Sequence, residues 1–140
     1  MIYVDTSILV ALCTAEPKSE VVDKWHSNSS AKLISSTWSF TEFSSALSLK
    51  IRTNQITEKQ SHDAWKKFDF LCQNDIELMS IENKTYYSAG ILVIDSKSNL
   101  RAGDALHLAA AKSLKAKSLI TLDKVLEKNA SQLKIKTILI

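Results

Sequence analysis

Short apolar runs alternate along this chain with longer segments in which apolar positions recur every three or four residues. Short runs of Ile, Leu and Val are typical of parallel strands that are buried on both faces, and the longer segments have the spacing of amphipathic helices. The predicted strands are 2–4, 33–35, 76–80, 118–121 and 137–140. The predicted helices are 19–27, 38–52, 57–74, 83–97, 101–115 and 124–129. This alternation predicts an α/β fold with a mostly parallel five-stranded sheet.

The segment 57–74 has the clearest helical pattern. Its apolar residues fall on one face of a helix with a period of 3.6 residues. They are Ala64, Trp65, Phe68, Leu71 and Cys72. Together with 38–52, this segment places two helices between the second and third strands, more than a minimal βαβ unit of about 30 residues needs. We therefore expect a helical hairpin that projects from the sheet.

The length of 140 residues, with 45% hydrophobic residues, indicates one globular domain, 1–140. Cys13 and Cys72 are far apart and have no metal-binding spacing, which predicts buried, reduced thiols in a cytoplasmic protein. The apolar N-terminus contains Asp5, has no basic segment before it and is shorter than the ~18 residues of a membrane span. We therefore expect no membrane partner.

Four acidic residues stand where predicted strands end or helices begin. Asp5 directly follows the first strand, Asp123 lies just beyond the fourth, and Glu42 is in the first turns of the helix after the second. The carboxyl ends of parallel strands share one edge of an open sheet, where ligands bind. Asp104 begins helix 101–115, although no strand directly precedes that helix. We expect the four carboxylates to share one crevice.

Taken singly, each acid is explained more simply as a helix cap. Asp5 and Asp123 fit N-cap positions, Asp104 a first turn, and Ser39-x-x-Glu42 a capping box. Helix capping does not explain why all four acids would converge in one crevice. Two carboxylates about 5 Å apart repel by on the order of 3 kcal/mol at an effective dielectric of ~20. Such a cluster takes up protons or cations. Oxygen ligands favour Mg²⁺ or Mn²⁺, and one or two such ions serve phosphodiester hydrolysis through a metal-activated water. We predict all four acids as catalytic metal ligands.

Several polar residues beside the acids have two interpretations each. The hydroxyl residues are Thr6, Ser7 and Thr121. They either orient the metal ligands and the attacking water or serve as ordinary turn and capping groups. Arg101 either holds a phosphate, pairs with Asp104 or lies on the surface. His107 shares a helix face with Asp104, where it either relays protons or packs between leucines.

The four acids lie in short motifs. These are Val4-Asp5-Thr6-Ser7, Thr41-Glu42-Phe43, Arg101-Ala-Gly-Asp104-Ala-Leu-His107 and Thr121-Leu-Asp123. In order and spacing they resemble the PIN-domain ribonucleases, and among them the VapC-type toxins of bacterial toxin–antitoxin pairs, over residues 2–139. Asp5, Glu42, Asp104 and Asp123 match the acidic positions of the family, the last of which is its most variable. Thr6, Ser7 or Thr121 match its hydroxyl positions.

The resemblance implies a three-layer α/β/α PIN fold and Mg²⁺- or Mn²⁺-dependent endoribonuclease activity on RNA. It also implies that a cognate antitoxin inhibits the protein. The resemblance further implies that the chain forms a homodimer and, with the antitoxin, a toxin–antitoxin hetero-oligomer. One alternative function stays open, a PIN-like domain that binds RNA or protein without catalysis. Such a domain would be expected to have lost at least one acid, whereas this chain has all four.

Two other acid-rich α/β classes lack their motifs here. Haloacid-dehalogenase phosphatases need a second Asp two residues after the first, and Ser7 occupies that position. Receiver domains need an Asp at the end of the third strand, where this chain has Ser80.

The net charge of +3 permits a nucleic-acid partner without requiring one. The surplus of positive charge lies in the second half of the chain, where it predicts either a phosphate-binding rim near Asp123 or a solvated face. The lysines that supply it are Lys112, Lys115, Lys117, Lys124, Lys128, Lys134 and Lys136.

Overall fold

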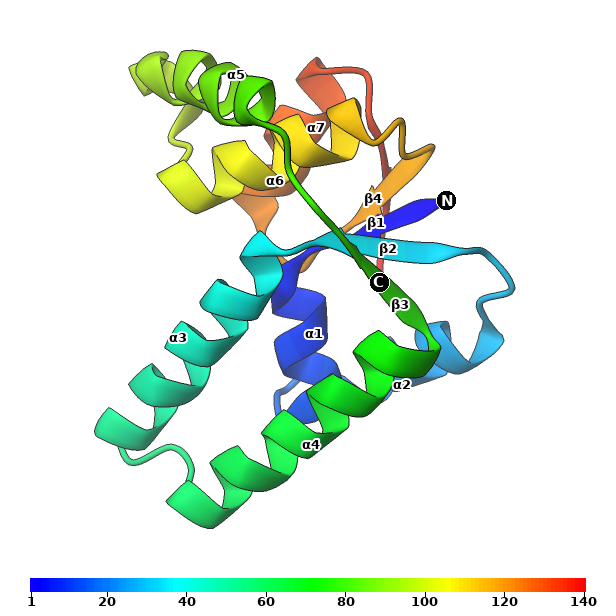
Figure 1. The fold of residues 1–140 in the computed structure, drawn as a ribbon, viewed down its shortest axis with the longest axis vertical. Helices are drawn as coiled ribbons and strands as arrows, with labels where there is room; N and C mark the ends of the chain where they lie inside the picture. The colour runs from blue at the N-terminus through cyan, green and yellow to red at the C-terminus, as the bar shows by residue number, and fades with distance from the viewer.

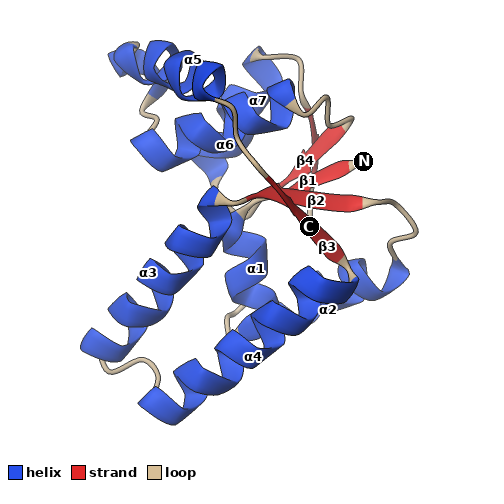
Figure 2. Ribbon diagram, in the orientation of Figure 1, coloured by secondary structure: helices blue, strands red, loops and turns tan.

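A computed structural model describes residues 1–140 and contains one sheet with the strand order β3-β2-β1-β4-β5 (Figure 2). Every pair of neighbouring strands is parallel. The strands are β1 (Ile2–Val4), β2 (Leu33–Ser36), β3 (Ile76–Met79), β4 (Ser118–Ile120) and β5 (Lys136–Ile138). All five predicted strands are present, with small differences at their ends. The sheet is entirely parallel, as the apolar strand sequences favour.

Seven α-helices and one short 3₁₀ helix surround the sheet. They are α1 (Thr6–Cys13), α2 (Ser19–Asn28), α3 (Trp38–Arg52), α4 (Glu58–Asn74), α5 (Asn83–Ile94), η1 (Ser96–Ser98), α6 (Ala102–Ser113) and α7 (Lys124–Gln132). The sequence pattern did not predict α1, because its apolar residues are spread around the helix and most of them are buried. The helix predicted over 83–97 ends at Ile94, and Asp95 then caps η1.

Helices cover both faces of the sheet, as Figure 1 shows, with α1 to α4 on one side and α5 to α7 on the other. Successive strand residues point to opposite faces. Val4 and Ile120 therefore pack in the core under α1 to α4, whereas Tyr3 and Leu119 pack under α6 and α7. The expected three-layer α/β/α architecture is confirmed.

The predicted helical hairpin is formed by α3 and α4, which extend together from the sheet in Figure 1. Aromatic side chains join the two helices. Phe43 stacks on Phe68 with ring centroids 4.3 Å apart, and Trp65 meets the edges of both rings at 5.7 and 5.5 Å. Offset and edge-to-face contacts of this kind add to the burial of aromatic area.

Cys13 and Cys72 are free and half-buried rather than fully buried, and both pack against the core. Burial raises the pKa of the Cys13 thiol to about 12 and that of Cys72 to about 11. Thiols with such pKa values are poor nucleophiles at neutral pH. No helix is long and apolar enough to cross a membrane.

We expect Phe68→Ala to lower the free energy of unfolding by about 3 to 5 kcal/mol, because it empties a fully packed site between α3 and α4. Urea denaturation followed by circular dichroism measures this loss. Phe70→Ala is the matched control: Phe70 lies on the same helix but is exposed, so its removal should change stability by less than about 0.5 kcal/mol. Equal losses in the two variants would contradict the assigned core.

Candidate active site

The parallel sheet brings the predicted acids to its carboxyl edge. Tyr3 pairs with Leu119 and Val4 with Ile120, so Asp5 follows β1 beside Thr121 at the end of β4. Glu42 reaches the same edge because α3 begins immediately after β2. After β3, α5 and η1 return the chain to this edge, where α6 begins (Figure 1). This return places Asp104 there although no strand directly precedes its helix.

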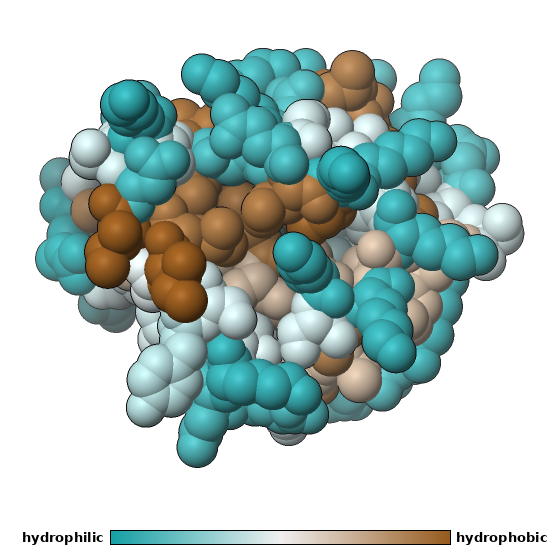
Figure 3. Space-filling model, turned by 90° about the horizontal axis from the view of Figure 1, so that it is seen from above, coloured by the Kyte–Doolittle hydropathy of each residue, from teal (hydrophilic) through white to brown (hydrophobic).

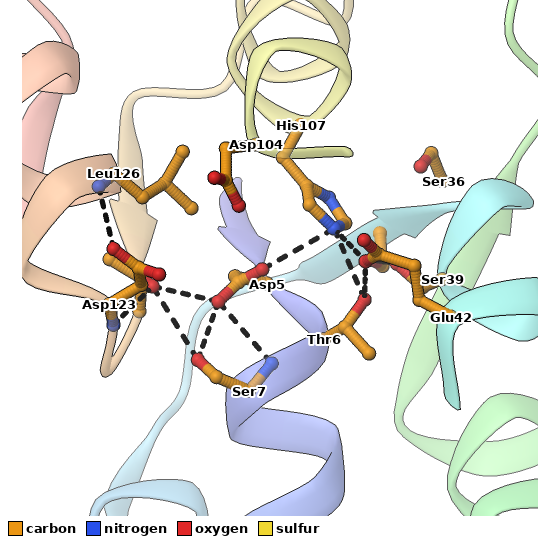
Figure 4. A network of polar contacts seen from close by, with 12 residues as sticks. Asp5, Thr6, Ser7, Ser36, Ser39, Glu42, Asp104, His107, Asp123 and Leu126 are labelled. Atoms are coloured by element: carbon orange, nitrogen blue, oxygen red, sulfur yellow. Dashed lines mark hydrogen bonds and ion pairs between the residues drawn. The ribbon is translucent and has the colours of Figure 1, made fainter. Parts of the chain in front are cut away.

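One open groove, with a volume of about 340 Å³, contains the four carboxylates. Figure 4 shows Asp5 between Asp123 on one side and Glu42 with His107 on the other. The residues that line the groove are Asp5, Thr6, Ser7, Val10, Glu42, Ser45, Ala46, Leu49, Asp104 and Asp123. The structure therefore brings together all four predicted acids and two of the predicted hydroxyl residues. Thr121 lies directly beneath them and contacts Asp5.

Asp5 is buried and anchored through one of its carboxylate oxygens. Its Oδ2 accepts hydrogen bonds from Ser7 Oγ at 2.5 Å and Thr121 Oγ1 at 2.7 Å. The backbone N–H of Ser7 donates to the same oxygen at 3.3 Å, so Asp5 is also the N-cap of α1. Asp5 therefore both caps α1 and lies in the acidic groove, two roles that the sequence presented as alternatives.

Glu42 is held by two polar side chains. Thr6 Oγ1 donates to its Oε2 at 2.7 Å, and His107 Nε2 lies 2.5 Å from the same atom. Burial by itself raises the pKa of Glu42, but these hydrogen bonds and the charge of His107 outweigh burial and bring the pKa below its ordinary value. The Ser39 capping box is wrong: α3 begins at Trp38, and Ser39 Oγ bonds Ser35 Oγ at 2.7 Å.

His107 is a buried cation beside these acids and is 1% exposed. Its Nε2 lies 3.4 Å from Asp5 Oδ1 as well as near Glu42. On the other side of the ring, Nδ1 lies 2.9 Å from the Tyr3 hydroxyl, which donates its own proton to Ser36 Oγ at 2.9 Å. Both ring nitrogens therefore face acceptors. Burial lowers the pKa of His107, but the Tyr3 oxygen and the two carboxylates together raise it well above its usual value.

The sequence left open whether His107 packs between leucines or acts in the site. The structure shows both: the ring is buried, and it links the strand residue Tyr3 to two acids. Sequence spacing related His107 only to Asp104, one helical turn away. Its contacts with Tyr3 and Glu42 span 104 and 65 residues of chain, so no local signal identified them.

Asp104 and Asp123 are more exposed than Asp5. Asp104 Oδ2 accepts a hydrogen bond from the backbone N–H of Arg101 at 3.1 Å. Burial, followed by repulsion from Asp123, Asp5 and Glu42, raises the pKa of Asp104 above its ordinary value. Asp123 caps α7, since its Oδ1 accepts from the N–H groups of Val125 and Leu126 at 2.7 and 2.9 Å.

Each carboxylate keeps one oxygen that the chain leaves largely unused. Glu42 Oε1, Asp104 Oδ1 and Asp123 Oδ2 accept no hydrogen bond from protein. Asp5 Oδ1 has only the 3.4 Å contact with His107. An oxygen held by the protein and a second left free is a donor set that fits a hard divalent cation. One ligand atom from each of Asp5, Glu42 and His107 lies within 4.8 Å of the other two.

Gly103 makes room for the Glu42 carboxylate. A Cβ atom at this position would overlap Glu42 Oε1 and lie 3.4 Å from Trp38 Nε1. The first turn of α6 therefore lies so close to the side chains of α3 that a methyl group at position 103 would displace the Glu42 carboxylate. The signal in the sequence was a glycine in a helical turn, where it costs roughly 0.5 to 1 kcal/mol relative to alanine.

The structure decides between the alternatives that the sequence left open for the basic residues. Arg101 is exposed and forms no ion pair with Asp104. Lys124 follows Asp123, but Lys117 and Lys134 precede β4 and β5 and so lie at the opposite edge of the sheet. Lys117 and Lys134 therefore belong to the solvated face and not to a rim near Asp123, because residues before a parallel strand lie at its amino end.

Fold and groove define a parallel α/β domain with an acidic groove at the carboxyl edge of its sheet. The PIN domain family model matches residues 2–132, so the chain belongs to the PIN domain family. A search of curated proteins gave no match.

Solved structures of VapC-type proteins have the same fold. VapC20 of Mycobacterium tuberculosis, described as a toxin that cleaves the sarcin-ricin loop, has a TM-score of 0.74 and 14% identity, with 92% of this chain and 95% of that chain covered. VapBC2 of Rickettsia felis, solved with a DNA fragment from its promoter, has a TM-score of 0.66 and 16% identity, covering 99% and 98%. FitAcB of Neisseria gonorrhoeae has a TM-score of 0.66 and 15% identity, covering 99% and 97%.

We expect Asp104→Asn to raise the melting temperature of the metal-free protein at pH 7.5, by the equivalent of about 1 kcal/mol after solvent screening. The raised pKa of Asp104 means that its charge destabilises the folded state. The gain should therefore shrink as the pH falls toward the ordinary aspartate pKa, where the carboxyl is protonated in both states. Differential scanning calorimetry measures it. Asp63→Asn, at an exposed position on α4, should change little; a destabilised Asp104→Asn would contradict the repulsion.

We expect His107→Gln to destabilise the protein by roughly 3 kcal/mol at pH 6, because it removes the buried cation between Asp5 and Glu42. Since the pKa of His107 is raised, its stabilising charge is complete below the ordinary histidine pKa and is lost as the pH rises through the folded-state value. Urea denaturation across this range should show the variant approaching the parent at alkaline pH. A constant difference would indicate a packing role alone.

Proposed function

We propose that this PIN domain is a divalent-metal-dependent endoribonuclease that acts as the toxin of a toxin–antitoxin pair. The observation that carries the proposal is the set of four carboxylates in one groove, each with an oxygen that the chain leaves largely free. This arrangement is costly without a cation, because the acids repel one another. A single capping role for each acid gives no reason for their convergence.

The proposed metal ligands and catalytic residues are Asp5, Glu42, Asp104 and Asp123. When bound, Mg²⁺ or Mn²⁺ would supply an activated water and charge neutralisation for RNA phosphodiester hydrolysis, with one or two ions. All four ligands are oxygen donors, which suits these ions better than Zn²⁺.

The rest of the groove positions these ligands. Ser7 and Thr121 fix the inner oxygen of Asp5, and Thr6 and His107 fix that of Glu42. Such supporting hydrogen bonds set the direction of ligand oxygens and limit their motion. We propose that Arg101, which is exposed at the start of α6, contacts an RNA phosphate.

The proposed partners are an RNA substrate, a protein antitoxin, and a second copy of the chain. VapC20 is described as a toxin that cleaves the sarcin-ricin loop, and VapBC2 was solved with a fragment of promoter DNA. Their whole-chain similarity of fold supports a toxin role here. Co-expression with the product of a neighbouring short reading frame, followed by co-purification, tests the antitoxin.

We expect the purified protein to cleave RNA with Mg²⁺ or Mn²⁺ and to lose this activity in EDTA. Asp5→Asn should lower the cleavage rate at least about a hundredfold, because it removes one of the proposed metal ligands. Gel analysis of a whole-RNA pool with end mapping measures this. Asp63→Asn is the matched control and should keep the parental rate. Cleavage that survives EDTA would contradict the metal mechanism, and RNA binding that is indifferent to EDTA, without cleavage, would indicate a binding module.

We expect Gly103→Ala to lower cleavage at least about tenfold while changing stability by less than about 1 kcal/mol. The added methyl group displaces the flexible Glu42 carboxylate without a clash against backbone, and alanine is the better helix former. Mn²⁺ titration of the melting temperature provides a second readout, since a displaced ligand weakens the metal-induced rise. Full activity in the variant would contradict the tight approach of α6 to Glu42.

A further inference from the structure

The indole nitrogen of Trp38 is a buried donor without a partner. Among the buried side-chain nitrogen and oxygen atoms, only Trp38 Nε1 and Thr85 Oγ1 lack a hydrogen-bond partner. A buried tryptophan usually satisfies its N–H group, and a buried donor that stays unpaired costs roughly 1 to 3 kcal/mol. Trp38 is the first residue of α3, one turn before Glu42, so this unpaired donor lies beside the acidic groove.

Trp38 Nε1 and Glu42 Oε1 meet in the space that Gly103 leaves open. A Cβ atom at Gly103 would overlap Glu42 Oε1 and lie 3.4 Å from Trp38 Nε1, so both atoms border the same point. Residues four apart share a helix face, and long side chains on a helix lean toward its N-terminus. The Glu42 carboxylate therefore leans back toward Trp38, and the donor and the acceptor are neighbours.

This neighbour is the Glu42 oxygen that no other group holds. Thr6 and His107 contact Oε2, whereas Oε1 accepts no hydrogen bond. Burial raises the pKa of Glu42, and His107, then Thr6 and then the Trp38 indole lower it, so the indole N–H favours the charged carboxylate. The terminal torsion of a glutamate side chain is broad. A small rotation of the carboxylate therefore completes the hydrogen bond from Trp38 to Oε1.

The half-buried ring of Trp38 packs inward. It lies against a small core cluster that contains Ala105 and Ala109 of α6. Strongly exposed hydrophobic side chains gather elsewhere, over α5, on the left of the view in Figure 3, and include Tyr87 and Ile91. Stacking on an RNA base, another use of tryptophan in nucleic-acid binding, needs an exposed ring. The burial of Nε1 instead directs this donor to a group of its own chain.

We propose that Trp38 is a positioning residue of the metal site and that its indole N–H holds Glu42 Oε1 in place. The inference rests on the proposed function, in which Glu42 is a metal ligand. Because Thr6 and His107 hold Oε2, a bond from Trp38 restrains the carboxylate at both oxygens. A carboxylate oxygen has two lone pairs, so Oε1 can accept from Trp38 and still bind a divalent cation. Removal of such a supporting hydrogen bond lowers metal affinity by about 10- to 100-fold.

The first test compares Mn²⁺ binding by Trp38→Phe and by the parent, using isothermal titration calorimetry without RNA. Phenylalanine keeps an aromatic ring between α3 and α6 but has no N–H group. We expect the dissociation constant for Mn²⁺ to rise at least about tenfold in this variant. Trp25→Phe, which makes the same change on α2 where the ring packs against the main core, is the matched control and should keep the parental affinity.

The second test follows the indole N–H resonance of Trp38 by NMR in the metal-free protein. The chain has three tryptophans, so Trp25→Phe and Trp65→Phe identify the Trp38 resonance even if Trp38→Phe does not fold. A charged acceptor makes a stronger hydrogen bond than a neutral amide and moves the proton resonance downfield. We therefore expect Glu42→Gln to move the Trp38 resonance upfield. Asp123→Asn removes a different acid of the groove and should leave it in place.

Equal Mn²⁺ affinity in Trp38→Phe and the parent would overturn the proposal. A Trp38 resonance that Glu42→Gln does not move would also overturn it, and a loss of affinity in Trp38→Phe would then reflect packing alone. A parent protein that binds no Mn²⁺ would overturn the proposed function together with this inference. A parent that binds Mn²⁺ and cleaves RNA, with a Trp38→Phe variant that binds Mn²⁺ equally well, would overturn only the inference.

Discussion

Repulsion among four carboxylates in one groove is the constraint on which this structure depends. Burial, followed by repulsion from its three acidic neighbours, raises the pKa of Asp104 above its ordinary value. The chain offsets part of this repulsion with the buried cation His107, placed between Asp5 and Glu42. Hydroxyl groups and helix N–H donors stabilise one oxygen of each acid. The remaining negative charge faces the open groove, where a divalent cation would compensate it.

The parallel sheet makes this arrangement possible because it brings chain segments far apart in sequence to the same edge. Because the strands are short, the neighbouring helices lie close to that edge. A small displacement of these helices would therefore move the residues of the site. The approach of Gly103 to Glu42 and the link from Tyr3 through His107 both depend on α6 lying tightly against the sheet. Packing of α6 through small residues therefore serves the site as well as the core.

The two glycines of the chain have opposite surroundings. Gly103 faces an atom of its own chain, and its absence of a side chain preserves the position of Glu42. Gly90 faces solvent on α5, where an added Cβ atom would meet nothing within 4 Å.

The sequence by itself determined the α/β class, the five strands, the α3–α4 hairpin and the positions of the four acids along the chain. These follow from local periodicity and from the rule that parallel strands share a carboxyl edge. It did not reveal α1, whose apolar residues surround a largely buried helix and leave no amphipathic pattern.

Only the tertiary structure decided which groups contact the acids. His107, Tyr3 and Gly103 act through neighbours that are 60 or more residues away, and local spacing contains no information about such pairs. The same holds for the lysines: their number was plain from composition, but the direction of each strand decided which edge they occupy. Long-range placement depends on how the layers pack.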